Sequence, residues 1–275
     1  MRSERDWQAE PYGWWGYGWQ QAERLSVVQL IAAGNFDART AALLWLMLDA
    51  RASLIVAADP PGAGKTTTLS ALCAFLPATT QRVYLRGRNE TFDFLGATAP
   101  ARGYLLCNEI SNHLPVYLWD RQVGELFALV VAGYGLGATM HAESLAEIAA
   151  TLEGYPLYVP RAAVARLDLL LTLAVDYIER RPRRHLAELT LLRRDGTGDD
   201  FDPVTLAWWE AGQHAVAHAA GPLPPGIARR VGLAPEAVAA EIARRAAYLA
   251  DLAARDVREY EAVQRAIAAY ACREL

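Results

Sequence analysis

The segment DPPGAGKT, which starts at Asp59, could bind a phosphate group. It fits the pattern GxxxxGK[ST] except at its first position, where aspartate replaces glycine. Gly62 and Gly64 let successive backbone N–H groups point inward, and a helix that begins at this loop would add its dipole. Lys65 would place its ammonium group between the β- and γ-phosphates of ATP, and Thr66 would offer its hydroxyl to Mg²⁺. The pattern predicts a nucleotide-binding loop made of Pro61, Gly62, Ala63, Gly64, Lys65, Thr66 and Thr67.

Lys65 is the single lysine of a chain that carries 26 arginines. A bias toward arginine would replace lysine wherever only charge matters, but would spare a site that needs a compact ammonium group. A glycine-rich turn that binds nothing is the alternative interpretation of the short pattern. The strand-like run before the loop, the helix-like run after it and the isolated lysine together favour a nucleotide site.

Glu109 follows the strand-like run GYLLCN and is the candidate for the second half of such a site. A nucleotide-hydrolysing site needs a carboxylate at the end of a neighbouring strand, to hold Mg²⁺ through water and to orient the attacking water. Thr66 and Glu109 are therefore the predicted metal ligands. A surface carboxylate at a strand end is the alternative interpretation of Glu109.

His141 lies in the segment GYGLGATMHAES, between a short strand-like run and a helix-like run. A histidine in this position could donate a hydrogen bond to the γ-phosphate and report its presence. A histidine with a purely structural role is the alternative, because single histidines at strand ends are usually structural.

The elements that must position these residues alternate between strand and helix. Residues 53–58 (SLIVAA) form a continuous apolar run, which is typical of a parallel strand buried on both faces. Further strand-like runs occupy 82–85, 103–106, 137–140 and 169–175, with helical segments that include 122–132 and 144–154. The alternation predicts an α/β fold with a mainly parallel sheet and right-handed crossovers.

The chain divides by composition into three parts. Residues 1–24 form an aromatic leader, which is expected to cover an apolar face of the domain itself more than to dock on a partner. Residues 25–195 form the core and end in an edge hairpin at 172–192, whose basic turn is expected to be a solvated tip or a subunit contact. Residues 196–275 form a turn-rich linker followed by a small helical region.

Composition excludes several classes of protein. Hydrophobic residues make up 53% and charged residues 21% of the chain, which excludes wholesale disorder. The net charge of −4 predicts no specific nucleic-acid partner. The three cysteines, Cys73, Cys107 and Cys272, are too far apart for a CxxC zinc motif and are expected to be reduced and buried. Neither a membrane span nor a signal peptide is visible, so we expect a cytoplasmic protein, either free or peripheral at the inner face of the cell membrane.

The three motifs in this order resemble the type II/IV secretion ATPase superfamily, and in particular its archaeal-type branch, which powers type IV pilus assembly, type II-like secretion and the archaellum. The likeness runs over about residues 24–271: SVVQLIAAGNF through the phosphate loop, LLCNEIS, AGYGLGATMHAES, the hairpin and the closing helices. It implies a RecA-like P-loop core, ATP and Mg²⁺ as cofactors, a hexamer of identical subunits, and a membrane platform protein as partner.

This sequence departs from the family pattern at several positions. Only about 25 residues precede the core, where family members usually carry an N-terminal domain. In the acidic box, Arg86 stands in the first glutamate position, and only Glu90 matches the second, which makes Glu90 a predicted catalytic residue. Ser111 replaces an arginine and Tyr134 replaces the first histidine of the histidine box.

Two functional hypotheses follow. The first is a working motor ATPase, with Lys65, Glu109, His141 and Glu90 as its catalytic residues. The second is a paralogue that binds ATP but hydrolyses it slowly, and that regulates or scaffolds a full-length motor, because losing a general base costs typically 10²- to 10⁴-fold in rate. A small-molecule kinase is a weaker third interpretation, since it shares the phosphate loop but fits the histidine box and closing helices poorly.

Overall fold

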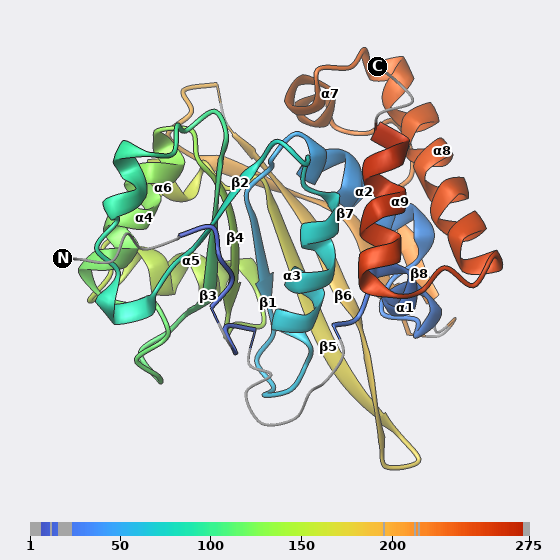
Figure 1. Cartoon of the computed structure of the whole chain (residues 1–275), viewed down its shortest axis with the longest axis horizontal. Helices are drawn as coiled ribbons and strands as arrows, with labels where there is room; N and C mark the ends of the chain where they lie inside the picture. Colours follow the sequence, from blue (N-terminus) through green and yellow to red (C-terminus); the bar gives the residue numbers. More distant parts are fainter. Residues whose placement is uncertain are drawn as a thin grey trace.

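The computed structural model describes residues 7–11, 13–15, 24–194, 196–211, 213 and 215–271. Within these residues the chain forms one eight-stranded sheet in the order β2-β3-β4-β1-β5-β6-β7-β8, with helices on both sides (Figure 1). The strands are β1 (Leu54–Ala57), β2 (Gln81–Tyr84), β3 (Gly103–Ile110), β4 (Gly135–Met140), β5 (Leu169–Ile178), β6 (Arg181–Arg194), β7 (Phe201–Glu210) and β8 (Ala215–His218).

The α-helices are α1 (Val27–Ala32), α2 (Ala38–Asp49), α3 (Lys65–Leu72), α4 (Arg121–Val131), α5 (Leu145–Glu153), α6 (Arg161–Val164), α7 (Pro225–Val231), α8 (Pro235–Ala254) and α9 (Tyr260–Ala271). Three 3₁₀ helices are described, η1 (Cys73–Phe75), η2 (Gly87–Asn89) and η3 (Asp93–Gly96). None of the helices in the described part of the chain is both long and apolar enough to cross a membrane.

Five neighbouring strands of the sheet run parallel, and the remaining pairs are antiparallel. Strands β2, β3, β4, β1 and β5 pair in parallel, whereas β6, β7 and β8 continue the sheet with antiparallel pairs. This arrangement confirms the predicted α/β class with a mainly parallel sheet.

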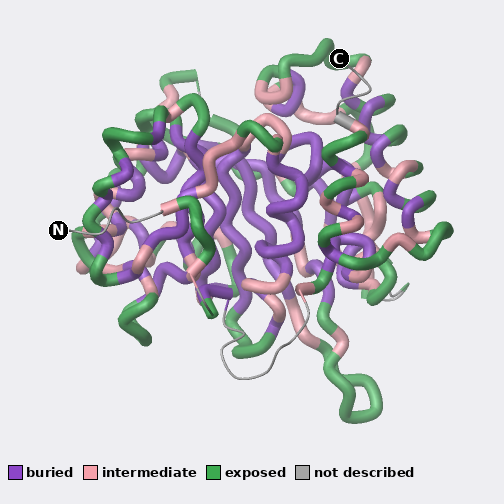
Figure 2. The backbone as a smooth tube through the Cα atoms, viewed as in Figure 1, coloured by how far each residue is buried: buried purple, intermediate pink, exposed green. Residues whose placement is uncertain are grey.

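Strand β1 is buried on both faces because helices cover both sides of the sheet. Its residues alternate between two apolar clusters: Leu54 and Val56 pack with α2, α3, α8 and α9, while Ile55 and Ala57 pack with α4, α5 and α6. Successive side chains of a strand point to opposite faces, so both sets must be apolar. Figure 2 shows the centre of the sheet as continuously buried backbone.

The predicted position of the hairpin at the edge of the sheet is wrong. Strands β5 and β6 do form the predicted hairpin, but β7 pairs with β6 and β8 pairs with β7 beyond it. The sequence pattern of β7 is weak because Pro203 interrupts it. In the structure, too, the burial of its residues does not alternate regularly. Pro203 lies opposite Leu192 in the register, where a residue without an N–H group is tolerated.

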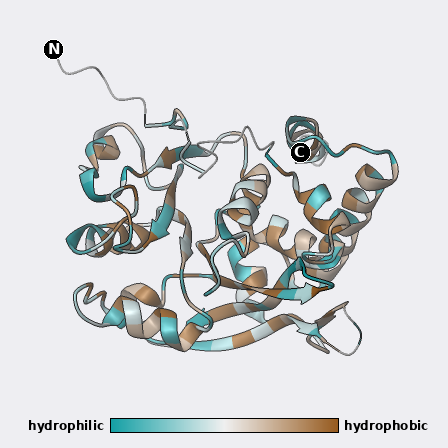
Figure 3. Cartoon of the chain, turned by 90° about the horizontal axis from the view of Figure 1, so that it is seen from below, coloured by the Kyte–Doolittle hydropathy of each residue, from teal (hydrophilic) through white to brown (hydrophobic). Residues whose placement is uncertain are grey.

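The C-terminal helices pack on α2 through a cluster of aromatic rings and charges. The ring of Trp45 stacks on Phe75 with centroids 5.5 Å apart, and the guanidinium group of Arg245 lies 4.7 Å from its centroid. Arg245 also pairs with Asp49 at 2.8 Å and with Glu241 at 2.6 Å. Figure 3 shows these helices banded in hydrophilic and hydrophobic residues, as expected for helices with one buried side.

The helices that precede β1 begin at side-chain caps. Ser26 and Gln29 form a reciprocal capping box at the start of α1. The Asp37 carboxylate accepts the Thr40 N–H at 2.8 Å and caps the start of α2. Cys73 and Cys107 are free thiols in the buried core, as predicted, whereas Cys272 lies outside the described residues.

The described part of the aromatic leader lies against the body of the domain. Trp14 and Trp15 are buried and contact the ring of Tyr84 edge to face. The Trp14 indole N–H donates to the Leu85 carbonyl at 3.0 Å, and the Asn108 amide donates to the Trp14 carbonyl. These contacts agree with the expectation that the leader covers the domain's own apolar surface. The rest of the leader, residues 1–6, 12 and 16–23, lies outside the described residues.

We expect Trp14→Ala to lower the free energy of unfolding by about 3 kcal/mol, because it removes a buried indole and its hydrogen bond. Urea unfolding followed by circular dichroism measures the change. Tyr155→Ala is the control, since Tyr155 is 84% exposed and should change stability by less than about 0.5 kcal/mol. Equal effects of the two substitutions would show that the leader does not stabilise the domain.

Candidate functional site

The candidate residues converge because three parallel strands end at the same edge of the sheet. Lys65 follows β1, Glu109 lies near the end of β3, and His141 follows β4. Strand β4 lies between β3 and β1 in the sheet, so His141 lies between the other two residues (Figure 1). Neighbouring strands are about 4.8 Å apart, which places all three side chains within reach of one ligand.

The predicted phosphate loop has the backbone geometry of an anion site. Gly62 and Gly64 adopt φ values of +76° and +93°, a region that other residues rarely occupy. Gly64 is also the N-cap of α3 and, having no side chain, makes no capping hydrogen bond. The dipole of α3 therefore favours an anion at the loop.

Lys65 is buried at the base of the loop. Its Nζ donates to the Ala58 carbonyl at 3.1 Å and lies 3.2 Å and 3.3 Å from the two ring nitrogens of His141. Burial lowers the pKa of Lys65, and the charges of Glu109 and Asp59 partly oppose that change. The ammonium group thus lies in an environment where an added negative charge would be favourable.

His141 and Glu109 face each other across the end of the site. The imidazole Nδ1 lies 3.0 Å from the Asp59 carbonyl oxygen and 3.2 Å from the ammonium nitrogen of Lys65. The other nitrogen, Nε2, lies 3.5 Å from Glu109 Oε1. That oxygen is buried and accepts no hydrogen bond from the described residues. A carboxylate oxygen in this state favours a cation or a water molecule beside it.

A bulge in β3 sets the position of Glu109. Cys107 lies opposite Ala138 and Ile110 lies opposite Met140, so β3 has one more residue than β4 between these pairs. The extra residue breaks the alternation of side chains at Asn108 and Glu109. Thr139 holds the bulge because its hydroxyl donates to the Asn108 carbonyl.

The residues present fit a divalent cation at this end of the site. Glu109, His113 and His141 each offer one donor atom, and these atoms lie within 4.8 Å of one another. The unpartnered Glu109 oxygen is the observation that supports a bound ion, and Thr66 lines the same cavity. His113 lies in a loop, and no motif or spacing in the sequence points to it as a site residue.

A cavity of about 660 Å³ joins these groups. All of the predicted loop residues line it, as do Glu109 and His141. Tyr117 also lines the cavity, and burial together with the charge of Glu109 raises its pKa. The structure therefore brings together every predicted site residue except Glu90.

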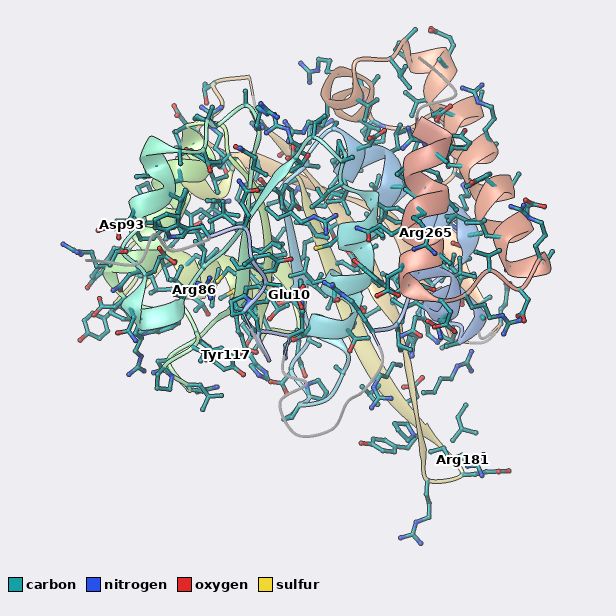
Figure 4. The ribbon with its side chains drawn as sticks, in the orientation of Figure 1. Glu10, Arg86, Asp93, Tyr117, Arg181 and Arg265 are labelled. Carbon is teal, nitrogen blue, oxygen red and sulfur yellow. The ribbon has the colours of Figure 1, made fainter. Side chains whose placement is uncertain are left out.

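The β5–β6 hairpin contributes arginines that the sequence analysis assigned to a solvated tip or a subunit contact. Arg183 and Arg184 line the cavity, and the Arg184 Nε donates to the Gly62 carbonyl at 2.6 Å. The guanidinium group of Arg183 lies 4.6 Å from the centroid of the Trp209 ring. Arg181, nearer the turn, points away from the body of the domain (Figure 4).

Glu90 lies outside the cavity and holds its own loop. One carboxylate oxygen accepts the Arg86 N–H at 2.7 Å, and the other accepts the N–H groups of Thr91 and Phe92 at 3.0 Å and 2.7 Å. Phe92 has a φ of +54°, and this hydrogen bond helps to fix its left-handed conformation. These hydrogen bonds support a structural role for Glu90 in its loop. Its catalytic role stays a prediction.

The similarities to known proteins are distant. No family model matches the chain. An uncharacterized protein of Methanocaldococcus jannaschii is 26% identical over 172 residues, which are 54% of this chain and 30% of that protein's length. The chain thus matches less than a third of this relative.

Two solved structures are similar to part of the chain. The VirB11 ATPase of the Brucella suis type IV secretion system has a TM-score of 0.36 at 18% identity, over 53% of this chain and 50% of that one. The Legionella pneumophila ATPase DotB has a TM-score of 0.35 at 12% identity, over 56% of this chain and 50% of that one. Both solved structures are ATPases.

Proposed function

We propose that this chain binds ATP together with Mg²⁺ at the phosphate loop and hydrolyses it. The observation that carries the proposal is the convergence of Lys65, His141 and Glu109 from three strands onto one cavity beside an uncapped helix N-terminus. A glycine-rich turn that binds nothing would not require a buried ammonium group, a buried carboxylate and an imidazole at its mouth.

Each residue would have a distinct role in this reaction. The ammonium group of Lys65 and the loop N–H groups would neutralise charge on the phosphates. Thr66 and Glu109 would hold Mg²⁺, which supplies charge neutralisation to the phosphates when bound. Glu109 would orient and polarise the attacking water, and His141 would donate a hydrogen bond to the terminal phosphate.

The work coupled to hydrolysis is proposed from the sequence resemblance alone. We propose that the chain acts as a motor ATPase of the archaeal-type branch, in a hexamer or a related homo-oligomer. Its proposed partner is the membrane platform of a type IV pilus or secretion machine, which would place it peripherally at the inner face of the membrane.

A slow or inactive hydrolase is the second candidate function. The placement of Glu90 favours it, because both oxygens of that carboxylate are engaged by backbone N–H groups outside the cavity. Among the described residues that line the cavity, Glu109 is the single carboxylate. In this case the chain would bind ATP as a regulatory or scaffolding subunit beside another motor.

The two candidates are separated by measuring ATP binding and Mg²⁺-dependent phosphate release on the full chain over a series of protein concentrations. A rate of phosphate release per protein molecule that rises with protein concentration supports a motor that works as an oligomer. Tight binding with release at the background rate supports the regulatory subunit. Absence of any ATP binding would contradict the proposal in both forms.

The arginine of the hairpin should strengthen nucleotide binding. We expect Arg184→Ala to weaken ATP binding about tenfold, because its guanidinium group lies on the phosphate loop and carries a charge that phosphates would contact. Calorimetric titration with ATP measures the affinity. Arg181→Ala is a matched control on the same strand, and we expect less than about a twofold change because Arg181 points away from the domain. Equal losses in the two variants would assign the effect to net charge alone.

A further inference from the structure

A second cationic cleft lies at the end of the sheet opposite the phosphate loop. It has a volume of about 500 Å³ and is built where β5 begins, β6 ends and α7 packs beside them. Figure 1 shows α7 at the opposite side of the molecule from the β5–β6 turn. The arginines that line the cleft are Arg166, Arg193, Arg194, Arg229 and Arg230.

One buried carboxylate lies at the base of this cleft. Asp168 accepts the Ser53 N–H at 2.8 Å, and its oxygens lie 3.3 Å from Arg230 and 3.8 Å from Arg194. It is the single carboxylate among the described lining residues. Arg193 pairs with Asp202 at 2.9 Å, and of the other four lining arginines only Arg194 and Arg230 have a described ion pair with Asp168. Positive charge in the cleft therefore exceeds the negative charge that the described lining supplies.

Two donors in the cleft have no acceptor. The Nε atoms of Arg166 and Arg230 are buried from solvent and donate no hydrogen bond to the described residues. A buried donor without an acceptor costs about 1–3 kcal/mol, and more when it is charged. The charge of an anion in the cleft would offset part of this cost for the two guanidinium groups.

The arginines also repel one another. Burial lowers the pKa of Arg194, the charge of Asp168 opposes that change, and the charges of Arg166, Arg230 and Arg229 lower it further. Like charges that are held together by a fold are a common feature of anion sites, because the ligand relieves the repulsion.

Guanidinium groups select the chemistry of the ligand. Their planar forks donate paired, parallel hydrogen bonds to phosphate oxygens and remain protonated at any physiological pH. We propose that this cleft binds a phosphate-bearing anion, as a site distinct from the phosphate loop. The phosphate could belong to a soluble molecule or to a lipid headgroup, since both present the same oxygens.

Pyrophosphate is a suitable probe because it carries the charge of a phosphate ligand without a base or an acyl chain. Calorimetric titration at low ionic strength is carried out on the full chain with Lys65→Ala, which weakens the phosphate loop and leaves the cleft unchanged. We expect this variant to bind one pyrophosphate. Arg166→Gln with Arg229→Gln in the same background should weaken that binding at least about tenfold. Neither arginine forms an ion pair with Asp168, so the fold should be retained.

A charge-matched control uses Arg121→Gln with Arg258→Gln in the Lys65→Ala background. Neither arginine lines the cleft, and their side chains are at least half exposed. We expect pyrophosphate binding to be unchanged in this control. No binding by the Lys65→Ala protein, or equal losses in the cleft variant and the control, would overturn the proposal. The proposed ATP site is tested separately, because its binding depends on Lys65 and not on the cleft arginines.

Vesicles distinguish the two sources of phosphate. Sedimentation with phosphatidylglycerol vesicles, compared with phosphatidylcholine vesicles, tests a lipid headgroup. Vesicle binding that the cleft substitutions abolish and pyrophosphate displaces supports a headgroup ligand. Pyrophosphate binding without vesicle binding supports a soluble ligand.

Discussion

Glu109→Gln should slow Mg²⁺-dependent phosphate release about 100-fold or more while leaving ATP affinity within about threefold of the original value. The amide is nearly the same size as the carboxylate but cannot accept a proton or balance the charge of a cation. The carboxylate that the substitution replaces carries the buried Oε1, which lies 3.5 Å from His141 Nε2. Steady-state phosphate release and calorimetric ATP binding measure the two effects.

Two other glutamates provide comparisons for this result. Glu143→Gln is a control because Glu143 is exposed and does not line the cavity. Glu90→Gln should lower the free energy of unfolding by about 1–3 kcal/mol, since it leaves a backbone N–H without its acceptor. If Glu90→Gln slowed release as strongly as Glu109→Gln without loss of stability, Glu90 would be catalytic as the sequence predicts. If the unsubstituted protein released phosphate no faster than Glu109→Gln, the regulatory interpretation would be favoured.

Lys65→Met should weaken ATP binding about 100-fold, because it removes the charge that would contact the phosphates. The same substitution should leave the nucleotide-free protein as stable as before or more stable. Burial lowers the pKa of Lys65, so the folded protein holds this proton less tightly than the unfolded chain does. A methionine side chain keeps the packing and removes the buried charge.

The sign of the pH dependence provides a check on this argument. Between the lowered pKa of Lys65 and its ordinary value, the unfolded chain binds more protons than the folded protein, so Lys65 makes stability rise with pH in that window. Below the window the penalty for the buried charge is fully present. Urea unfolding at about pH 7 and about pH 9.5 should therefore show a smaller gain with pH in Lys65→Met than in the unsubstituted protein. If both proteins gained the same stability between these pH values, burial would not destabilise the ammonium group of Lys65.

The phosphate loop could be predicted because its structure is encoded in consecutive residues. The left-handed conformations of Gly62 and Gly64, the start of α3 at Lys65 and the buried β1 before it all depend on local residue types. Glu109 and His141 could be predicted as candidates for the same reason, since each ends a recognisable apolar run. The contacts among the three could not, because they depend on β4 being inserted between β3 and β1.

Strand β7 could not be predicted from the pattern of its own residues. Its sequence contains Pro203 and two acidic residues, which favour a linker when the segment is considered alone. Pairing with β6 overrides that preference, since β6 presents a long strand whose far side would otherwise be an open edge. The hairpin therefore lies inside the sheet, and the arginines on it reach the phosphate loop instead of solvent alone.

By itself the sequence determined the fold class and the glycine-rich turn before α3, and it indicated Lys65, Glu109 and His141 as candidate residues, because turns, helix starts and buried strands follow from the order of nearby residues. Only the tertiary structure decided that His141 lies between Lys65 and Glu109, that Glu90 faces its own loop, and that arginines from three separate segments gather around Asp168. The position of His141 depends on the insertion of β4 between β3 and β1, and the arginine cluster depends on contacts among segments between residues 166 and 230. Long-range pairing is set by the packing of the whole core, so no local pattern specifies it.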